Sequence, residues 1–417
     1  MSDDTARTQR NDRVASRLRQ RYAAERRFRL FGLAAVTFSA LVLAFLLFSM
    51  TANGIGGFKR TEIKLDLDFP QSGMVIDAKR LTQEDPMGGL ELAGLKRSVE
   101  AAAVSNYGPK GTDLISADAW REVGQALIAE PAMLSRKATL SLPASDDLAS
   151  ALRGEGQPEL QPVARKLESE GRLGVEWDKG FLSRSDATSP QAVGIWGALK
   201  GSMLTMFVTL ILAFPVGVLA AVYLEEYAPR NRWTDVIEIT INNLAAVPSI
   251  IFGLLGLAVF LAIFPNYRSA PLIGGLTLAL MTMPVIVISG RNAIKAVPPS
   301  IRDGALAIGA SRIQVVFHHV LPLALPGILT GTIIGMARAL GETAPLLMIG
   351  MRAFVATAPT GFTSPSSVLP VQIFLWSDEI DRGFIERTSA AIIVLLAFLL
   401  VMNGLAIYLR NRFEKRW

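Results

Sequence analysis

The sequence contains no cysteine and only two histidines among its 417 residues. The absence of cysteine excludes disulfides, thiolate metal sites and cysteine nucleophiles. The two histidines, His318 and His319, are adjacent and point to different faces of any helix, so no metal site is expected. Charged residues make up only 19% of the chain, against about 25% in soluble domains, while 51% of residues are hydrophobic. This balance indicates a membrane protein with an added polar region.

Six apolar stretches are each long enough to cross a bilayer, which takes roughly 20 residues. The first could instead be a signal peptide, but such peptides have a shorter apolar stretch of about 7–15 residues. A retained anchor is therefore expected. The stretches are 30–50, about 201–223, 240–263, 272–290, 327–350 and 389–409.

Residues 51–192 differ in kind, because charges are frequent and apolar runs are short. "TEIKLDLDF" (61–69) alternates apolar and polar residues, which is typical of a strand. "SADAWREVGQALIAE" (116–130) has helical spacing, and "LQPVARKLESE" (160–170) also indicates a helix. We expect a folded α+β domain with a stabilising or interaction role. It contains no histidine and no Gly-rich phosphate loop, so no catalytic set is apparent.

Arginine and lysine in short loops favour the cytoplasmic side of a membrane. The arm 1–29 carries nine arginines, and basic residues recur in the loop near 230, in the loop 291–325 and in the tail after 409. If six spans alternate, these segments all fall on one side. Both termini are then cytoplasmic, and 51–192 is external.

The loop 291–325 reads as a short helical hairpin. Ser300 with Asp303, and Ser311 with Gln314, have the spacing of capping boxes. Gly309 can adopt the left-handed conformation that ends a helix. On these residues alone the loop is either a capped connector or a docking site.

The loop resembles the coupling motif of ABC importer permeases, in which an acid-Ala-Ala triplet precedes a glycine and a Leu-Pro pair. Two departures from the family pattern are an Asp-Gly start to the triplet and His319 at a usually aliphatic position. The resemblance implies an ATPase coupling loop. Its matching residues here are Asp303, Gly304, Ala305, Gly309, Leu321 and Pro322.

Four further motifs resemble the PstA-type permease of the bacterial phosphate ABC importer: "YLEEYAP" (223–229), "NLAAVPSIIFGLLGLAVF" (243–260), "ARALGETAPLL" (337–347) and "LPVQIF" (369–374). The resemblance covers roughly 195–417. It implies a multi-pass inner-membrane permease that works by alternating access with a second related permease. A cytoplasmic ATP-binding dimer would dock on the hairpin, and a periplasmic protein would deliver phosphate. The chain would bind no cofactor itself, and it has no G-x-x-x-x-G-K-[ST] loop for ATP.

Arg338 and Glu342 lie four residues apart within the apolar stretch 327–350. If one helix continues through this stretch, Arg338 is near mid-membrane and Glu342 lies one turn further on the same face. Such an arginine must face protein or water. It is either a phosphate donor that Glu342 orients, or half of a structural clamp. The resemblance favours the substrate path, to which Thr343 and Arg291 are also assigned.

The expected fold is thus an α-helical polytopic membrane protein with an inserted external α+β domain. Its predicted parts are an arm (1–29), a first span (30–50), a periplasmic domain (51–192) and a five-helix permease core (193–417). Membrane lipid is an expected partner, and nucleic acid is not. Alternatives are a permease for another oxyanion such as sulfate or molybdate, a membrane-anchored sensor, and a membrane-bound enzyme.

Overall fold

The computed structural model describes residues 2–70, 86–351, 354–355, 357–381 and 383–413. It divides into two compact units, Met1–Asn53 and Gly54–Trp417. The first unit lies in one helix, α1 (Ser2–Gly54), whose residues 21–48 are all exposed. Among the described residues, five helices are long and apolar enough to cross a membrane, or six if one bent pair counts as a single span.

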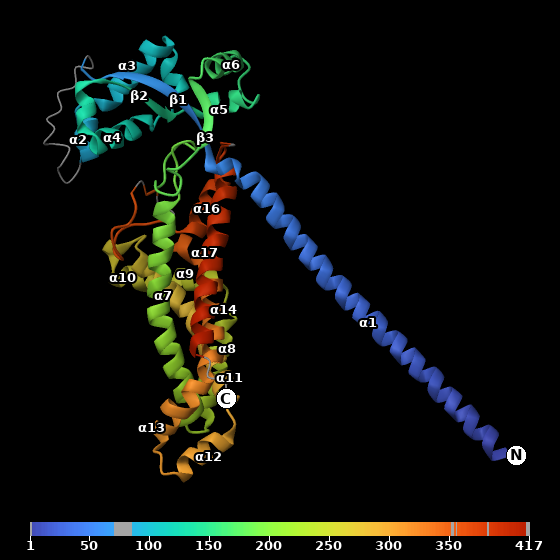
Figure 1. The fold of residues 1–417 in the computed structure, drawn as a ribbon. Coiled ribbons are helices and arrows are strands. Elements are labelled where there is room, and N and C mark those ends of the chain that lie inside the picture. The colour runs from blue at the N-terminus through green and yellow to red at the C-terminus, as the bar shows by residue number, and fades with distance from the viewer. Residues whose placement is uncertain (1, 71–85, 352–353, 356, 382, 414–417) are drawn as a thin grey trace. The chain divides into compact units, whose positions relative to one another are not determined.

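The polar region folds around a three-stranded antiparallel sheet of order β2-β1-β3 (Figure 1). The strands are β1 (Lys59–Asp68), β2 (Lys137–Pro143) and β3 (Leu173–Trp177). Ile63, Leu65 and Leu67 of β1 are buried and their neighbours are not, which confirms the strand predicted from alternation.

Helices cover this sheet and complete its core. They are α2 (Pro86–Leu92), α3 (Leu95–Tyr107), α4 (Ala119–Ala129), α5 (Asp146–Leu152) and α6 (Gln161–Ser169). Trp120, Val123 and Leu127 of α4 are buried on one face. The two helices predicted near 116–130 and 160–170 are confirmed, and we call residues 59–177 the sheet domain.

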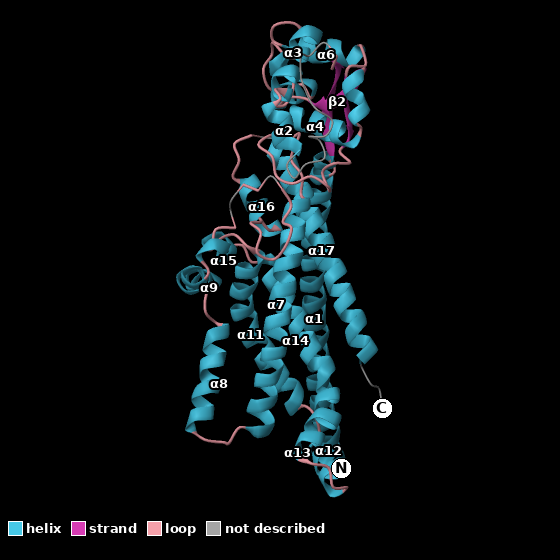
Figure 2. Cartoon of the chain, turned by 90° about the vertical axis from the view of Figure 1, so that its left-hand side faces the viewer, coloured by secondary structure: helices cyan, strands magenta, loops and turns pink. Residues whose placement is uncertain are grey.

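The remaining chain is helical. Its longest helices are α7 (Trp196–Val222), α11 (Pro271–Lys295), α14 (Leu321–Gly341) and α17 (Gly383–Phe413). α7, α11 and α14 lie side by side and share a buried core (Figure 2). A Cβ added at Gly275 would lie 2.4 Å from the Val208 side chain, so this glycine allows α7 and α11 to pack closely.

Shorter helices are α8 (Arg232–Ala245), α9 (Ser249–Leu255), α10 (Leu261–Ile263), α12 (Pro299–Ala307), α13 (Arg312–Gln314), α15 (Ala344–Met348) and α16 (Leu369–Ser377).

Two of the predicted spans are broken. The stretch 240–263 is not one helix, because the helical segments 232–245 and 249–263 meet at 103°. Pro248 caps the second segment with an extended backbone, and its ring prevents the helix from continuing. The stretch 327–350 also breaks, because α14 ends at Gly341 and Glu342 is extended. Pro345 therefore lies in the first turn of α15, where proline is tolerated, and not inside one long helix.

A buried ion pair and two hydrogen bonds attach the segments that flank the sheet domain to the start of α17. Arg387 is 2% exposed, and its guanidinium donates to the carbonyl oxygens of Pro190 at 2.7 Å and Gly57 at 2.6 Å. Its Nη2 also lies 3.0 Å from Oδ2 of Asp178, which follows β3. The same carboxylate accepts from Arg184 at 2.7 Å. Helix α17 thus contacts the chain both before β1, at Gly57, and after β3, at Asp178.

We predict that Arg387→Met loosens this attachment. The change removes the charge but keeps a long side chain, and it leaves the two carbonyl groups without their donor. Losing a buried charge and its hydrogen bonds should cost about 3 kcal/mol of stability. The measurements are the thermal unfolding temperature and hydrogen exchange of the amides near 57 and 178.

Glu386→Gln is the matched control. Glu386 lies 3.8 Å from Arg153 of the sheet domain, but their side chains are 40% and 34% exposed. An exposed pair contributes less than about 1 kcal/mol. Equal effects of the two substitutions would show that Arg387 does not anchor the domain.

Candidate functional site

The charged pair singled out in the sequence remains in contact although its helix breaks. Arg338 lies in the last turn of α14, and its Nε is 3.4 Å from Oε1 of Glu342. The Arg338 side chain is 48% exposed, while that of Glu342 is 19% exposed. Ala339 and Leu340 are buried on the other side of the same turn. The guanidinium therefore lies on the open face of α14, away from the core of its own chain.

Arg338 keeps most of its hydrogen-bonding capacity. Within the described part of the chain, no acceptor contacts its two terminal guanidinium nitrogens. A planar guanidinium with two free terminal nitrogens can bind an oxyanion through parallel hydrogen bonds. Thr343, the third predicted residue, precedes α15, and its side chain does not cap that helix. The arrangement suits an anion contact better than a closed clamp.

The helices that follow the two breaks, α9 and α15, lie against each other. A Cβ added to Gly253 of α9 would be 2.6 Å from Cα of Pro345 at the start of α15. Only glycine permits this approach. Irregular backbone at membrane depth is tolerated where protein or a water-filled cavity surrounds it, and broken helices often build transport sites. The break after Arg338 is thus supported by a second broken segment.

Arg291 was assigned to the substrate path together with this pair. In the structure it lies near the end of α11, and its side chain is 11% exposed. Its Nη2 is 2.8 Å from Oε2 of Glu238 on α8, and its Nε is 3.5 Å from Oε2 of Glu225. Lys295 lies 3.6 Å from the same Glu225 oxygen. These contacts connect three helices, and an anion at Arg291 would have to compete with two carboxylates.

The predicted hairpin is present, with one correction. Gly309 has φ of +90° and ends α12 in the left-handed region. Ser311 and Gln314 form a capping box, as expected. Ser300 does not, because α12 begins at Pro299 and no side chain caps it. The fixed φ of proline already suits a first helical turn, so the hydroxyl is not needed there.

The motif residues of the hairpin have different surroundings. Ala305 is 5% exposed and packs in the core that α7, α11 and α14 share. Asp303 and Gly304 are exposed, and Leu321 and Pro322 form the first turn of α14. Three apolar side chains point outward from the same hairpin: Leu306 (47% exposed), Ile308 (81%) and Ile313 (63%). An exposed apolar patch of this kind is typical of a surface that meets another protein.

One set of contacts that supports the hairpin was not predicted from the sequence. Arg302 of α12 donates to Oε1 of Glu226 at 2.8 Å and to the carbonyl oxygens of Val297 and Ile294 at 2.7 and 2.9 Å. Glu226 lies in the π-helical turn Tyr223–Tyr227 that ends α7. The sequence offered one indication that Glu226 matters: it stands in the motif "YLEEYAP", directly after Glu225. This pair fixes the hairpin to α7.

These features define a class of protein: a multi-pass helical membrane protein with broken spans, an exposed charge at one break and a hairpin with outward apolar side chains. No group of three or more metal-ligating side chains occurs among the residues that the structure describes. Residues 196–416 match the family described as "Binding-protein-dependent transport system inner membrane component", and the chain belongs to this family. Residues 15–162 match a separate domain of unknown function, DUF3333.

Curated relatives agree with this assignment. The chain is 32% identical over 226 residues to the phosphate transport system permease protein PstA of Haemophilus influenzae, covering 54% of this chain and 78% of that protein. It is 30% identical over 251 residues to the probable ABC transporter permease YqgI of Bacillus subtilis, covering 57% and 84%. The match to PstA 1 of Mycobacterium tuberculosis is 35% over 158 residues, and it covers 38% of this chain and 51% of that protein.

Solved structures show weaker likeness. An inward-facing MetNI methionine ABC transporter chain matches with a TM-score of 0.41 at 17% identity, over 53% of this chain and 95% of that one. A bacterial alginate ABC transporter chain matches with a TM-score of 0.43 at 15% identity, over 62% and 90%. At TM-scores below 0.5 this likeness adds nothing to the sequence match.

We predict opposite effects for two glycine substitutions in the hairpin. A Cβ at either Gly304 or Gly309 would meet nothing within 4 Å, so sterics do not distinguish them. Gly309→Ala should cost about 1–2 kcal/mol, because an L-residue is strained at positive φ. Gly304→Ala should stabilise α12 by up to about 1 kcal/mol, because alanine is the better helix former.

Hydrogen exchange of the amides of residues 303–314 measures both effects. Exchange should become faster in the Gly309 variant and slower in the Gly304 variant. Similar exchange in the two variants would contradict a left-handed helix end at Gly309.

Proposed function

We propose that this chain is the membrane permease subunit of an ATP-driven importer of inorganic phosphate. The observation that carries the proposal is the similarity of its permease core to PstA proteins, which are named as phosphate transport permeases. The chain itself is not the catalyst, because ATP hydrolysis belongs to a separate partner. No specific feature favours sulfate or molybdate over phosphate.

Arg338 is the proposed phosphate contact. Its permanently charged, planar guanidinium has two terminal nitrogens that no described acceptor contacts, and these match two phosphate oxygens. Glu342 holds Nε at 3.4 Å and so orients the group. Its negative charge also weakens phosphate binding, which suits a path that must release its substrate. Thr343 lies directly after this pair and belongs to the same path.

The proposed partners rest on the hairpin and on the sequence, which has no G-x-x-x-x-G-K-[ST] motif for ATP. A dimer of cytoplasmic ATP-binding subunits docks on the outward apolar side chains of residues 306–313. A second related permease completes the path on the open face of α14, and a periplasmic protein delivers phosphate. The chain binds no cofactor, and lipid surrounds its spans.

The proposed location is the bacterial inner membrane, with both termini cytoplasmic and residues 51–192 in the periplasm. Basic residues of the short loops support this orientation. Because the chain lacks cysteine, introduced cysteines give unambiguous labelling. Ser105 of the sheet domain and Trp233 at the start of α8 are both exposed.

We therefore predict that a cysteine at Ser105 reacts with a membrane-impermeant maleimide in intact spheroplasts, where the periplasmic face is exposed. A cysteine at Trp233, which lies outside the hairpin that the ATP-binding subunits are proposed to cover, should react only after the membrane is opened. The reverse pattern would invert the orientation.

For the site itself, we predict that Arg338→Gln abolishes phosphate uptake while the yield of assembled complex is unchanged. Arg338→Lys should reduce uptake roughly tenfold or more, because a charge-assisted hydrogen bond contributes about 1.5–3 kcal/mol and lysine lacks the planar fork. Complex yield and uptake are measured together for each variant.

Glu342→Gln and the double variant separate a ligand from a clamp. A clamp predicts that either single glutamine lowers the yield, because one charge is left without its partner, and that the double variant restores both yield and uptake. A phosphate contact predicts that the double variant assembles but stays inactive. Normal uptake by the double variant would refute the site assignment.

A further inference from the structure

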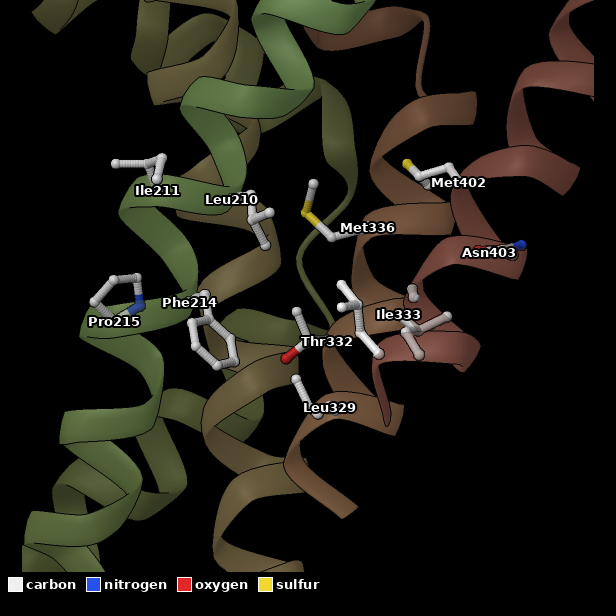
Figure 3. A pocket seen from close by; sticks show the side chains of 12 residues that line it. Leu210, Ile211, Phe214, Pro215, Leu329, Thr332, Ile333, Met336, Met402 and Asn403 are labelled. Atoms are coloured by element: carbon white, nitrogen blue, oxygen red, sulfur yellow. The ribbon is translucent and has the colours of Figure 1, made fainter. Parts of the chain in front are cut away.

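An apolar groove of about 330 Å³ opens between α7, α14 and α17. Figure 3 shows Leu210 and Phe214 of α7, Ile333 and Met336 of α14, and Met402 of α17 around it. The groove lies along helices that cross the membrane. Hydrocarbon is therefore the medium that reaches its opening, and an empty apolar groove there would forfeit dispersion contacts.

One face of α17 makes this groove amphipathic. Asn403, Ala406 and Arg410 are spaced three and four residues apart, so they lie on the same side of the helix. Asn403 and Ala406 line the groove, and Arg410 lies one turn beyond Ala406. Nη1 of Arg410 donates to Oγ1 of Thr330 at 3.3 Å, which places the guanidinium beside Leu329 at the end of the groove.

Both polar side chains on this face have unused hydrogen-bonding capacity. Nε of Arg410 is buried and has no acceptor among the described residues, and Oδ1 of Asn403 is buried and has no donor among them. Buried donors normally have a partner, so an unused guanidinium nitrogen indicates a missing acceptor. The tail from Arg410 onward adds three more basic residues and only one acid, Glu414. The missing acceptor is therefore expected to be an anion.

We propose that the groove binds an anionic phospholipid. One acyl chain lies along the apolar wall, and the phosphate of the headgroup accepts from the Arg410 guanidinium. A rotation of 180° about the Asn403 amide exchanges its oxygen and nitrogen, and the nitrogen can then donate to an ester carbonyl of the lipid. Basic positions between membrane helices at the cytoplasmic end are typical places for anionic headgroups.

The chemistry of the groove favours an acyl chain over a helix. An apolar helix seated on it would leave the buried Nε of Arg410 without an acceptor, whereas the phosphate of a lipid supplies one. An acyl chain is narrow enough to enter. The charge at only one end also matches a lipid, which has a single anionic head and an apolar tail.

The test uses the complete transporter complex in nanodiscs of phosphatidylcholine that contain a trace of phosphatidylglycerol with a photoactivatable diazirine on one acyl chain. After irradiation, labelled peptides are mapped by mass spectrometry. We expect label on α14 and α17 peptides that contain Met336 and Met402. Arg410→Gln should lower this labelling roughly fivefold, the scale of one basic residue at an anionic surface. Arg412→Gln, which changes an exposed arginine two residues further on, should leave it unchanged.

Filling the groove tests the acyl chain separately from the head. Ala406→Phe on α17 and Leu329→Phe on α14 should each reduce labelling while Arg410 is retained, and two variants on different helices guard against failure of one to fold. Equal labelling by a phosphatidylcholine probe would overturn the role of Arg410. Unchanged labelling in both filled variants, or a cross-link from this groove to another protein chain, would overturn the lipid site.

Discussion

A charge inside hydrocarbon must have a partner or face water, and this constraint orders the membrane part of the chain. Arg291 meets Glu238 and Glu225, and Arg387 meets Asp178. Arg338 differs, because only its Nε is engaged and nearly half of its side chain is exposed. Among the described residues, Arg291 and Arg387 thus have carboxylate partners that occupy them, whereas Arg338 keeps both terminal nitrogens available on an exposed face. That contrast, more than the presence of an ion pair, identifies the candidate site.

Local patterns in the sequence predicted local structure well. The alternation of apolar and polar residues predicted β1, and the length of the apolar stretches predicted the spans. The positive φ of Gly309 and the capping box at Ser311 agree with the predicted hairpin. Both spans that break do so at Pro248 or just before Pro345, where hydropathy stays high. Length and hydropathy do not register a change in backbone direction, so the sequence prediction merged each pair of segments into one helix.

Contacts between residues that lie far apart in the sequence could not be predicted from local sequence patterns. Arg302 and Glu226 are 76 positions apart, and neither carries a pattern that names the other. Arg387 reaches Asp178 from the other end of the permease core, across the boundary of the sheet domain. Burial of these arginines follows from tertiary packing, which a single sequence does not display. The sheet domain was correctly predicted as a folded body, but its anchoring to α17 was not.

These contacts form a continuous path between the hairpin and Arg338. Arg302 joins α12 to the turn after α7, and the neighbouring Glu225 joins that turn to Arg291. Arg291 holds α8 through Glu238, and the segment after the bend, α9, packs through Gly253 on the first turn of α15.

That turn immediately follows the charged pair. A hairpin displaced by a partner would therefore move the break where Arg338 lies. Such coupling needs two discrete arrangements of the path, because contact alone transmits nothing. The bend at Pro248 and the break after Gly341 are two places on this path where continuous helical hydrogen bonds stop. A second arrangement of the backbone could form at these breaks, and one of them lies in the turn that holds Arg338.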